Sequence, residues 1–153
     1  MPAPASDPPA PWLVHCDGSA IPNPGRMGLG AVLVAPDGTR HLLSQKAAGL
    51  GCNNEAELRA LMAALRELQA RGATVLQVAC DNSLVVEQLG GAEARPVARL
   101  ADLFEEARAL LRAFEQVRLA WVPHHRNGEA DALARAALGM PPRPPVKPRK
   151  KRR

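Results

Sequence analysis

Residues 16–32 read CDGSAIPNPGRMGLGAV, and the interpretation of this stretch decides the fold. Asp17 follows an apolar run at 12–16, and four glycines lie between residues 18 and 30. The stretch is either a glycine-rich loop that cradles a phosphate or the end of a strand whose carboxylate holds a metal ion. The chain contains neither GxxxxGK[ST] nor GxGxxG, which argues against a phosphate loop and favours the carboxylate.

The pattern on either side of this stretch alternates between strands and helices. Apolar runs bounded by turn residues predict strands, and leucines at helical spacing before Gly72 predict a long helix that Asn54 caps. Pro96 is expected to open a second long helix, whose apolar stripe runs to Phe114. The predicted strands are 12–17, 28–35, 39–46, 74–80 and 117–122, and two further helices are 82–89 and 128–138. This order predicts an α/β fold with a mixed sheet and helices packed on its faces.

Length and composition predict one domain with an arm at each end. The 153 residues suffice for a single core, and both ends are rich in proline. We therefore expect a disordered arm at 1–11, a folded domain at 12–139 and a disordered tail at 140–153. No apolar run approaches the ~20 residues of a membrane helix, and the first residues lack the pattern of a secretory signal. Three widely spaced cysteines favour a reducing, cytoplasmic setting.

The positive charge is concentrated in the tail. Residues 143–153 hold seven of the 20 lysines and arginines and no acid, which leaves 13 basic against 15 acidic residues, or about −2, for the rest. Such a tail is typical of a segment that finds polyanions by charge. The alternative is a solubilising end without a specific partner.

Four acidic residues occupy positions that charge patterning does not explain. Asp17 and Asp81 each end an apolar strand, where ligands bind in α/β sheets. Glu57 and Asp131 fall on the apolar sides of their helices. Each has a structural alternative, since Asp is common in turns and Glu57 would complete a capping box with Asn54. Four such acids in separate elements nevertheless suit Mg²⁺ or Mn²⁺, and predict a metal-dependent phosphodiester enzyme.

Four segments in register carry a family resemblance. They are DGSAIPNPGRMGLGAV (17–32), NNEAELRALMAAL (53–65), CDNSLVVEQL (80–89) and WVPHHRNGEADALARAAL (121–138). Together they resemble type 1 ribonuclease H, from about residue 12 to residue 138. The resemblance implies a ribonuclease H-like fold with a five-stranded mixed sheet, whose first three strands are antiparallel. It implies an endonuclease that cuts the RNA strand of RNA–DNA hybrids and leaves 5′-phosphate and 3′-hydroxyl ends.

The resemblance also assigns site residues. It implies that Asp17, Glu57, Asp81 and Asp131 hold two Mg²⁺ ions, with Mn²⁺ as a substitute. It further implies that the RNA strand is recognised by its 2′-hydroxyls. The implied substrate-binding residues are Gly18, Ser19, Asn23, Asn53 and Asn54. His125 aligns with the family's active-site histidine, although the following loop is shorter, His124 is adjacent and an ordinary exposed histidine is the alternative. No obligate protein partner is expected, and the protein is predicted to be a monomer.

The tail has an expected role because the basic protrusion of some relatives is replaced here by GGAEARPVA (90–98). We expect the tail to contact nucleic acid through Arg149, Lys150, Lys151, Arg152 and Arg153, so that truncation after Gly139 raises KM. Two alternatives to the leading function stay open. They are a nuclease of the same fold that acts on another structured RNA, and a non-catalytic module that binds nucleic acid.

The cysteines are expected to be structural. Cys16 and Cys80 each precede a predicted catalytic aspartate, so their side chains should point to the opposite face of the sheet as small buried hydrophobes. A zinc site built from His15, Cys16, Cys52 and Cys80 is the alternative, but the spacing of these residues does not support it.

Overall fold

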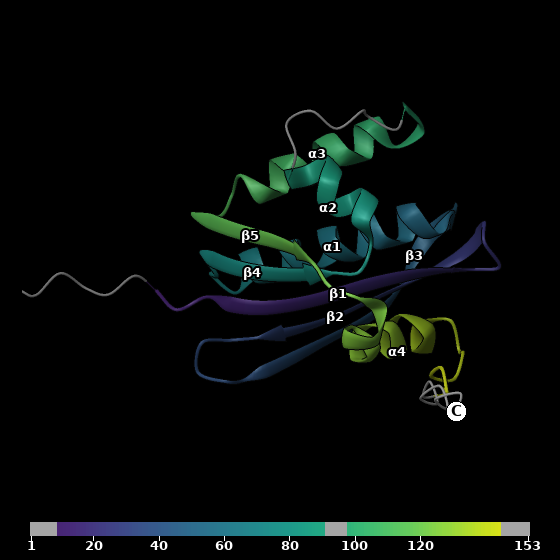
Figure 1. Ribbon diagram of the computed structural model, residues 1–153, viewed down its shortest axis with the longest axis horizontal. Coiled ribbons are helices and arrows are strands. Elements are labelled where there is room, and N and C mark those ends of the chain that lie inside the picture. Colours follow the sequence, from purple (N-terminus) through teal and green to yellow (C-terminus); the bar gives the residue numbers. More distant parts are fainter. Residues whose placement is uncertain (1–8, 91–97, 145–153) are drawn as a thin grey trace, which may run out of the picture.

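A five-stranded sheet forms the centre of the molecule (Figure 1). The computed structural model describes residues 9–90 and 98–144, so most of the predicted first arm and the basic end of the tail lie outside the described residues. The strands are β1 (Trp12–Ile21), β2 (Gly25–Val34), β3 (Arg40–Gly51), β4 (Val75–Cys80) and β5 (Gln116–Trp121). Their order in the sheet is β3-β2-β1-β4-β5. The first three strands are antiparallel, as predicted, and β4 and β5 run parallel to β1.

Helices cover both faces of this sheet. They are α1 (Asn53–Ala70), α2 (Ser83–Gly90), α3 (Ala101–Leu111) and α4 (Gly128–Ala137), with 3₁₀ turns η1 (Ala98–Leu100) and η2 (His124–Arg126). Figure 1 shows α1, α2 and α3 on one side of the strands and α4 on the other. The predicted fold, a mixed sheet with helices on both faces, is confirmed. None of the helices in the described ranges is long and apolar enough to cross a bilayer.

The main core lies between the sheet and α1. Leu58, Leu61, Leu65 and Leu68 are fully buried, which confirms the apolar side of this helix. Burial of each leucine stabilises the fold by about 1.5–3 kcal/mol. Side chains alternate along a strand. The side chain of Asp17 therefore points to the opposite face of the sheet from the β1 residues that lie in this core.

Cys16 and Cys80 pack in this core as predicted. They are register partners on β1 and β4, and both are fully buried among the apolar residues that face α1. The aspartates that follow them, Asp17 and Asp81, therefore leave the core at neighbouring positions of two parallel strands.

The start of α1 differs from the prediction. Cys52, not Asn54, is the N-cap residue, and its side chain makes no capping hydrogen bond. Asn54 lies inside the helix, where its Oδ1 accepts a hydrogen bond from Asn82 Nδ2 at 2.9 Å. Without a capping Asn54 there is no capping box, so the structural explanation for Glu57 is wrong.

Other predictions of element boundaries are wrong as well. The third strand, predicted at 39–46, is β3 and continues to Gly51. The strand β1 continues to Ile21, and β2 already begins at Gly25. The reason is that the glycines of this hairpin stay within the paired strands, and only the proline-containing turn lies outside them. The second long helix consists of η1 and the shorter α3, which ends at Leu111. Pro96 lies outside the described residues, and Phe114 packs in the core from beyond the end of α3.

Candidate active site

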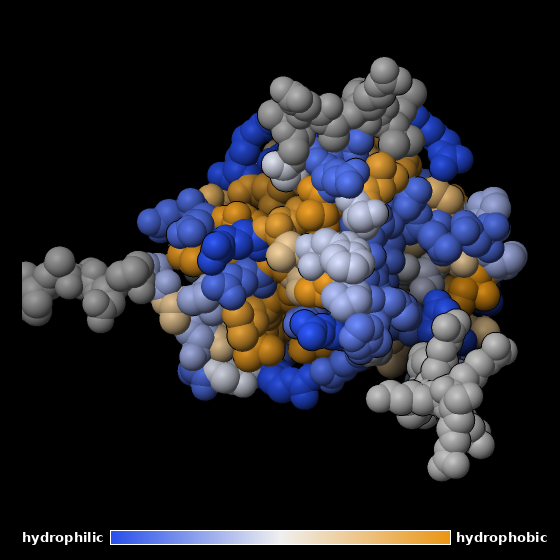
Figure 2. All heavy atoms as spheres, in the orientation of Figure 1, coloured by the Kyte–Doolittle hydropathy of each residue, from blue (hydrophilic) through white to orange (hydrophobic). Residues whose placement is uncertain are grey.

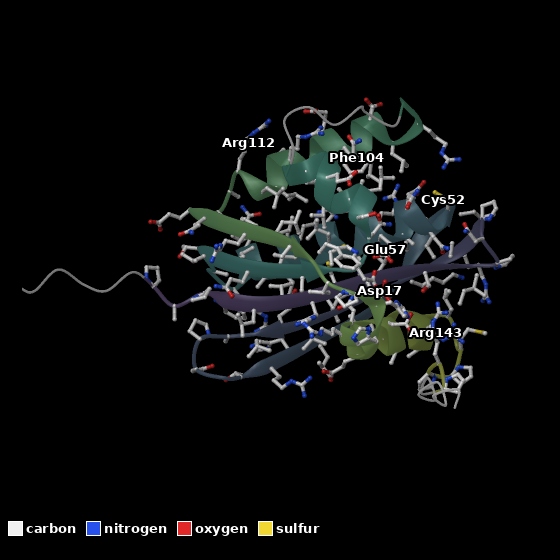
Figure 3. All side chains as sticks on the ribbon, viewed as in Figure 1. Asp17, Cys52, Glu57, Phe104, Arg112 and Arg143 are labelled. Atoms are coloured by element: carbon white, nitrogen blue, oxygen red, sulfur yellow. The ribbon has the colours of Figure 1, made fainter. Side chains whose placement is uncertain are left out.

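The four predicted acids gather at one cavity of about 360 Å³. Each acid comes from a different element: β1 supplies Asp17, α1 supplies Glu57, the turn after β4 supplies Asp81 and α4 supplies Asp131. The rest of the cavity is lined by Gly18, Ser19, Asn53, Asn82, Ser83, His124 and Arg143. Figure 3 shows the labelled Asp17, Glu57 and Arg143 in this region, where β1 passes between α1 and α4.

Asp17 and Glu57 form what we call the inner pair. They are 2% and 8% exposed. The backbone N–H of Gly18 donates to Asp17 Oδ1 at 3.0 Å. Asp17 Oδ2 and Glu57 Oε2 are buried and have no hydrogen-bond partner among the described residues. A buried carboxylate oxygen without a hydrogen-bond donor costs free energy. The oxygens of the inner pair are therefore candidate ligands of a cation.

Burial controls the protonation of the inner pair. Desolvation raises the pKa of Asp17 to about 7; the neighbouring Glu57 offsets part of this rise, and the charge of Asp81 adds to it. Desolvation, followed by the closeness of Asp17, raises the pKa of Glu57 well above its usual range. Without a cation the inner pair therefore retains protons near neutral pH, and a divalent ion would have to displace them.

Asp81 and Asp131 form the outer pair, and each has a partner. His124 Nδ1 lies 2.8 Å from Asp81 Oδ2, and the Asp81 side chain is 6% exposed. Ligand atoms of Asp17, Asp81 and His124 all lie within 4.8 Å of one another, a spacing that can hold a metal ion. Arg143 Nε donates to Asp131 Oδ2 at 3.1 Å, so the outer pair already faces basic side chains.

Glycines allow the two helices to bring their acids to the sheet. A Cβ at Gly18 would overlap the backbone of Ala56 in α1, next to Glu57. A Cβ at Gly30 would overlap the carbonyl oxygen of Ala130 in α4, next to Asp131. The glycines that first suggested a phosphate loop are therefore sites of close contact between helix and sheet.

Three of the five predicted substrate-binding residues lie at one rim of the cavity, and hydrogen bonds join Asn53 to Asn23 and to the backbone of Ala20. Asn53 Oδ1 accepts from the N–H of Ala20 at 2.8 Å, and Asn23 Oδ1 accepts from the N–H of Asn53 at 3.1 Å. Gly18, Ser19 and Asn53 line the cavity, whereas Asn23 and Asn54 lie behind it. These contacts hold the rim in place, while the role of these residues toward a substrate stays a prediction.

The two histidines differ in position. His124 contacts Asp81 and lines the cavity, while His125 is exposed in η2 and is absent from the cavity lining. The alignment that favoured His125 therefore does not correspond to the observed contact. His124 and His125 are adjacent in the sequence, and no spacing rule chooses between neighbours.

Sequence reasoning missed two residues of the site. Asn127 is 1% exposed, donates from Nδ2 to the carbonyl of Cys16 at 2.8 Å and faces His15 Nδ1 through Oδ1 at 3.2 Å. It thus ties the start of α4 to β1 beside Asp17. Arg143 was counted only as part of the basic tail. Both contacts join residues more than ten positions apart, so no local pattern marks them.

The residues fit hard divalent ions better than zinc. Carboxylate oxygens dominate the cavity and suit Mg²⁺ or Mn²⁺. The alternative zinc ligands are dispersed: His15 contacts Asn127, Cys52 Sγ accepts from Arg99 Nη2 at 3.2 Å, and Cys16 and Cys80 face the core. In the part of the chain that the structure describes, the one metal-capable group of three or more His, Cys, Asp or Glu residues is Asp17, Asp81 and His124.

Comparisons with known proteins agree with this fold. The family model described as reverse transcriptase-like matches residues 15–137. A ribonuclease H of Cupriavidus pinatubonensis is 37% identical over 138 residues, which cover 80% of this chain and 91% of that protein. The bifunctional protein Rv2228c of Mycobacterium tuberculosis is 39% identical over 127 residues, 82% of this chain, but the match spans only 35% of that protein's length.

Solved structures give the same result. The crystal structure of ribonuclease H1 from Halobacterium salinarum matches with a TM-score of 0.79 and 34% identity, over 85% of this chain and 98% of that one. The LC11 ribonuclease H1 in complex with an RNA/DNA hybrid matches with a TM-score of 0.76 and 28% identity, over 84% and 96% of the two chains. Fold and carboxylate cavity define a domain of the ribonuclease H-like class. The chain belongs to the ribonuclease H family.

Proposed function

We propose that this protein is an endoribonuclease that hydrolyses the RNA strand of RNA–DNA hybrids and leaves 5′-phosphate and 3′-hydroxyl ends. The observation that carries the proposal is the meeting of four carboxylates from four separate elements at one cavity. Two of the carboxylate oxygens are buried without a donor among the described residues. A similar chain, the LC11 enzyme, was crystallised with an RNA/DNA hybrid, which supports the choice of substrate.

Asp17, Glu57, Asp81 and Asp131 are the proposed ligands of two Mg²⁺ ions, for which Mn²⁺ substitutes. When bound, such ions activate the attacking water and stabilise the departing oxygen at the phosphorus. The protein's own part is to hold these carboxylates in place on β1, α1, α4 and the end of β4, and to release the protons of the inner pair.

The remaining site residues have proposed roles toward the substrate. His124, beside Asp81, is placed to move a proton or help the product leave, and it takes over the role expected of His125. The rim of Gly18, Ser19 and Asn53, supported by Asn23 and Asn54, is proposed to contact the RNA 2′-hydroxyls. Arg149–Arg153 are proposed to hold phosphates, and they lie outside the described residues.

A non-catalytic binding module is the main alternative, and the site argues against it. A module that only binds nucleic acid has no use for four carboxylates gathered at one cavity, whereas a metal-dependent nuclease needs them as ligands. The cytoplasmic location and the monomeric state stay predictions.

One assay separates the candidates. Labelled 12–20-mer RNA–DNA hybrid, duplex RNA and duplex DNA are each incubated with Mg²⁺, Mn²⁺ or a chelator. We expect cleavage confined to the RNA of the hybrid, and a loss of about a hundredfold to a thousandfold or more in Asp17→Asn. Cleavage of duplex RNA instead would favour the other structured-RNA substrate. Binding of hybrid without cleavage under any condition would contradict an enzymatic function.

A further inference from the structure

The chain after α4 turns back toward the carboxylates. Gly139 ends the helix with φ of 73°, and its N–H donates to the carbonyl of Ala136 at 3.0 Å. The N–H of Met140 donates to the carbonyl of Arg135 at 3.0 Å, and Arg135 Nε donates to the carbonyl of Pro141 at 2.8 Å. A glycine in this conformation reverses the chain at the end of a helix, and the contacts of Arg135 fix the direction it then takes.

The length of this returning segment matches the distance that it has to cover. Asp131 lies six residues before Ala137, the last residue of α4, which corresponds to about 9 Å at the rise of an α-helix, and Leu138 and Gly139 follow before the chain reverses. The four residues from Met140 to Arg143 span about 12 Å when extended, and the prolines of this segment favour such a conformation. Arg143 therefore returns to Asp131, and Figure 3 shows the labelled Arg143 beside α4.

Arg143 makes a specific contact there. Its Nε lies 3.1 Å from Asp131 Oδ2 and 3.4 Å from Asp131 Oδ1. The Asp131 side chain is 4% exposed, whereas that of Arg143 is 54% exposed. Among the described residues, Arg143 is also the one lysine or arginine that lines the carboxylate cavity.

We propose that Arg143 is an internal counter-ion of the metal-free site, which holds Asp131 and competes with a divalent cation for this carboxylate. The inference rests on the proposed function, because it assigns Asp131 to the metal. A nearly buried carboxylate needs a positive partner or donors, and the guanidinium supplies both. Because half of the Arg143 side chain is in solvent, it can leave Asp131 for water when a cation arrives. Arg143 is thus a positioning residue that raises the metal concentration needed to fill the site.

The first test measures Mn²⁺ binding to the full-length protein by calorimetry, without nucleic acid. Arg143→Gln and Arg143→Ala should bind Mn²⁺ about 1.5- to fivefold more tightly than the wild type, the range expected for loss of a half-exposed ion pair. Arg112→Gln is the control, because it removes the same charge from an exposed position at the end of α3, on the other side of the molecule in Figure 3. Its affinity should match the wild type.

The second test follows the contact itself. The NMR signal of the Arg143 Nε–H group is assigned in the wild type by its loss in Arg143→Lys, and Mg²⁺ is then added in steps. The signal should shift in proportion to Mg²⁺ occupancy, as the guanidinium leaves Asp131. A signal that does not respond while Mg²⁺ binds overturns the proposal.

The calorimetric outcomes separate this inference from the proposed function. Equal or weaker Mn²⁺ binding by the Arg143 variants overturns the inference alone, and so does an equal gain in Arg112→Gln, which would indicate a general effect of charge. No Mn²⁺ binding by any of the proteins overturns the proposed metal site together with the inference.

Discussion

The inner and outer pairs of carboxylates lie within one cavity but have different surroundings. Asp17 and Glu57 are buried with oxygens that have no partner among the described residues, and burial raises the pKa of both. Asp81 and Asp131 face His124 and Arg143. The protein thus keeps the inner pair partly neutral with protons and the outer pair balanced with side chains. We therefore expect a cation to displace protons from the inner pair and Arg143 from Asp131.

Figure 2 shows that polar side chains gather on part of the visible face, while apolar side chains are exposed elsewhere on it. A second hollow, of about 530 Å³, lies on the sheet face of β1, β4 and β5 and is lined by residues such as Leu13, Gln77 and Arg118. None of the four carboxylates lines it. The larger hollow is therefore not where the chemistry is expected; the carboxylate cavity is.

The largest expected effect concerns the pH dependence of the inner pair. Asp17 has a pKa of about 7 in the folded state against 3.8 in the unfolded chain, so between these values the folded state binds more protons. The free energy of unfolding of the metal-free protein therefore falls as pH rises. From pH 5 to pH 8 the contribution of Asp17 is a loss of about 2–3 kcal/mol.

Urea denaturation in chelator at pH 5, 6, 7 and 8 measures this loss. Asp17→Asn is the control, because it removes the titrating group and keeps the shape of the side chain. The wild type should lose stability relative to this variant as pH rises, and Mn²⁺ should reverse the loss. Parallel pH profiles for the two proteins would contradict the protonated inner pair.

The second prediction displaces α4, which carries Asp131 of the outer pair, and leaves α1, which carries Glu57 of the inner pair, in place. Gly30→Ala would force α4, which carries Asp131, away from β2, whereas Glu57 is carried by α1 on the other side of the sheet. We expect a loss of about 1–3 kcal/mol in the free energy of unfolding. Cleavage of hybrid should fall by a larger factor than the fraction of folded protein.

Thermal denaturation and hybrid cleavage measure these two effects. Gly90→Ala is the matched control, because an added Cβ there has no neighbour within 4 Å among the described residues. A Gly30→Ala protein with wild-type stability and rate would show that α4 need not approach β2 so closely.

The third prediction tests the histidine of the outer pair. His124→Ala should lower kcat about tenfold or more, because this side chain contacts Asp81, whereas His125→Ala should change kcat by less than about twofold. Steady-state cleavage of a hybrid at saturating Mg²⁺ gives both values. A larger loss in His125→Ala would restore the assignment made from the sequence.

The smallest expected effect concerns the tail. A chain that ends at Pro144 retains Arg143 and removes the basic residues that follow, which separates the tail from the contact with Asp131. We expect KM for hybrid to rise about two- to fivefold at moderate salt and the salt dependence to weaken, with kcat similar. Unchanged KM at every salt concentration would show that the tail does not bind the substrate.

The order of the elements was predictable from local pattern. Apolar runs at 12–17 and 74–80 and the leucines of α1 follow periods that depend only on neighbouring residues. The same periodicity placed Glu57 on the buried side of α1, where its exposure is 8%. The boundaries were less predictable, since the glycines of the first hairpin break strands by propensity but permit close contact with helices in the fold.

The sequence by itself determined the mixed sheet, the buried side of α1 and the choice of the four candidate acids, because each follows from local residue spacing or from a motif of a known family. Only the tertiary structure decided which basic groups meet these acids. It placed His124 rather than His125 beside Asp81, tied Asn127 to Cys16 and returned Arg143 to Asp131. The physical reason is that these contacts join distant segments whose approach depends on chain reversal and on backbone packing at glycines. In CDGSAIPNPGRMGLGAV the sequence alone identifies the aspartate as a candidate ligand, but only the helices packed against the glycines explain the role of those glycines.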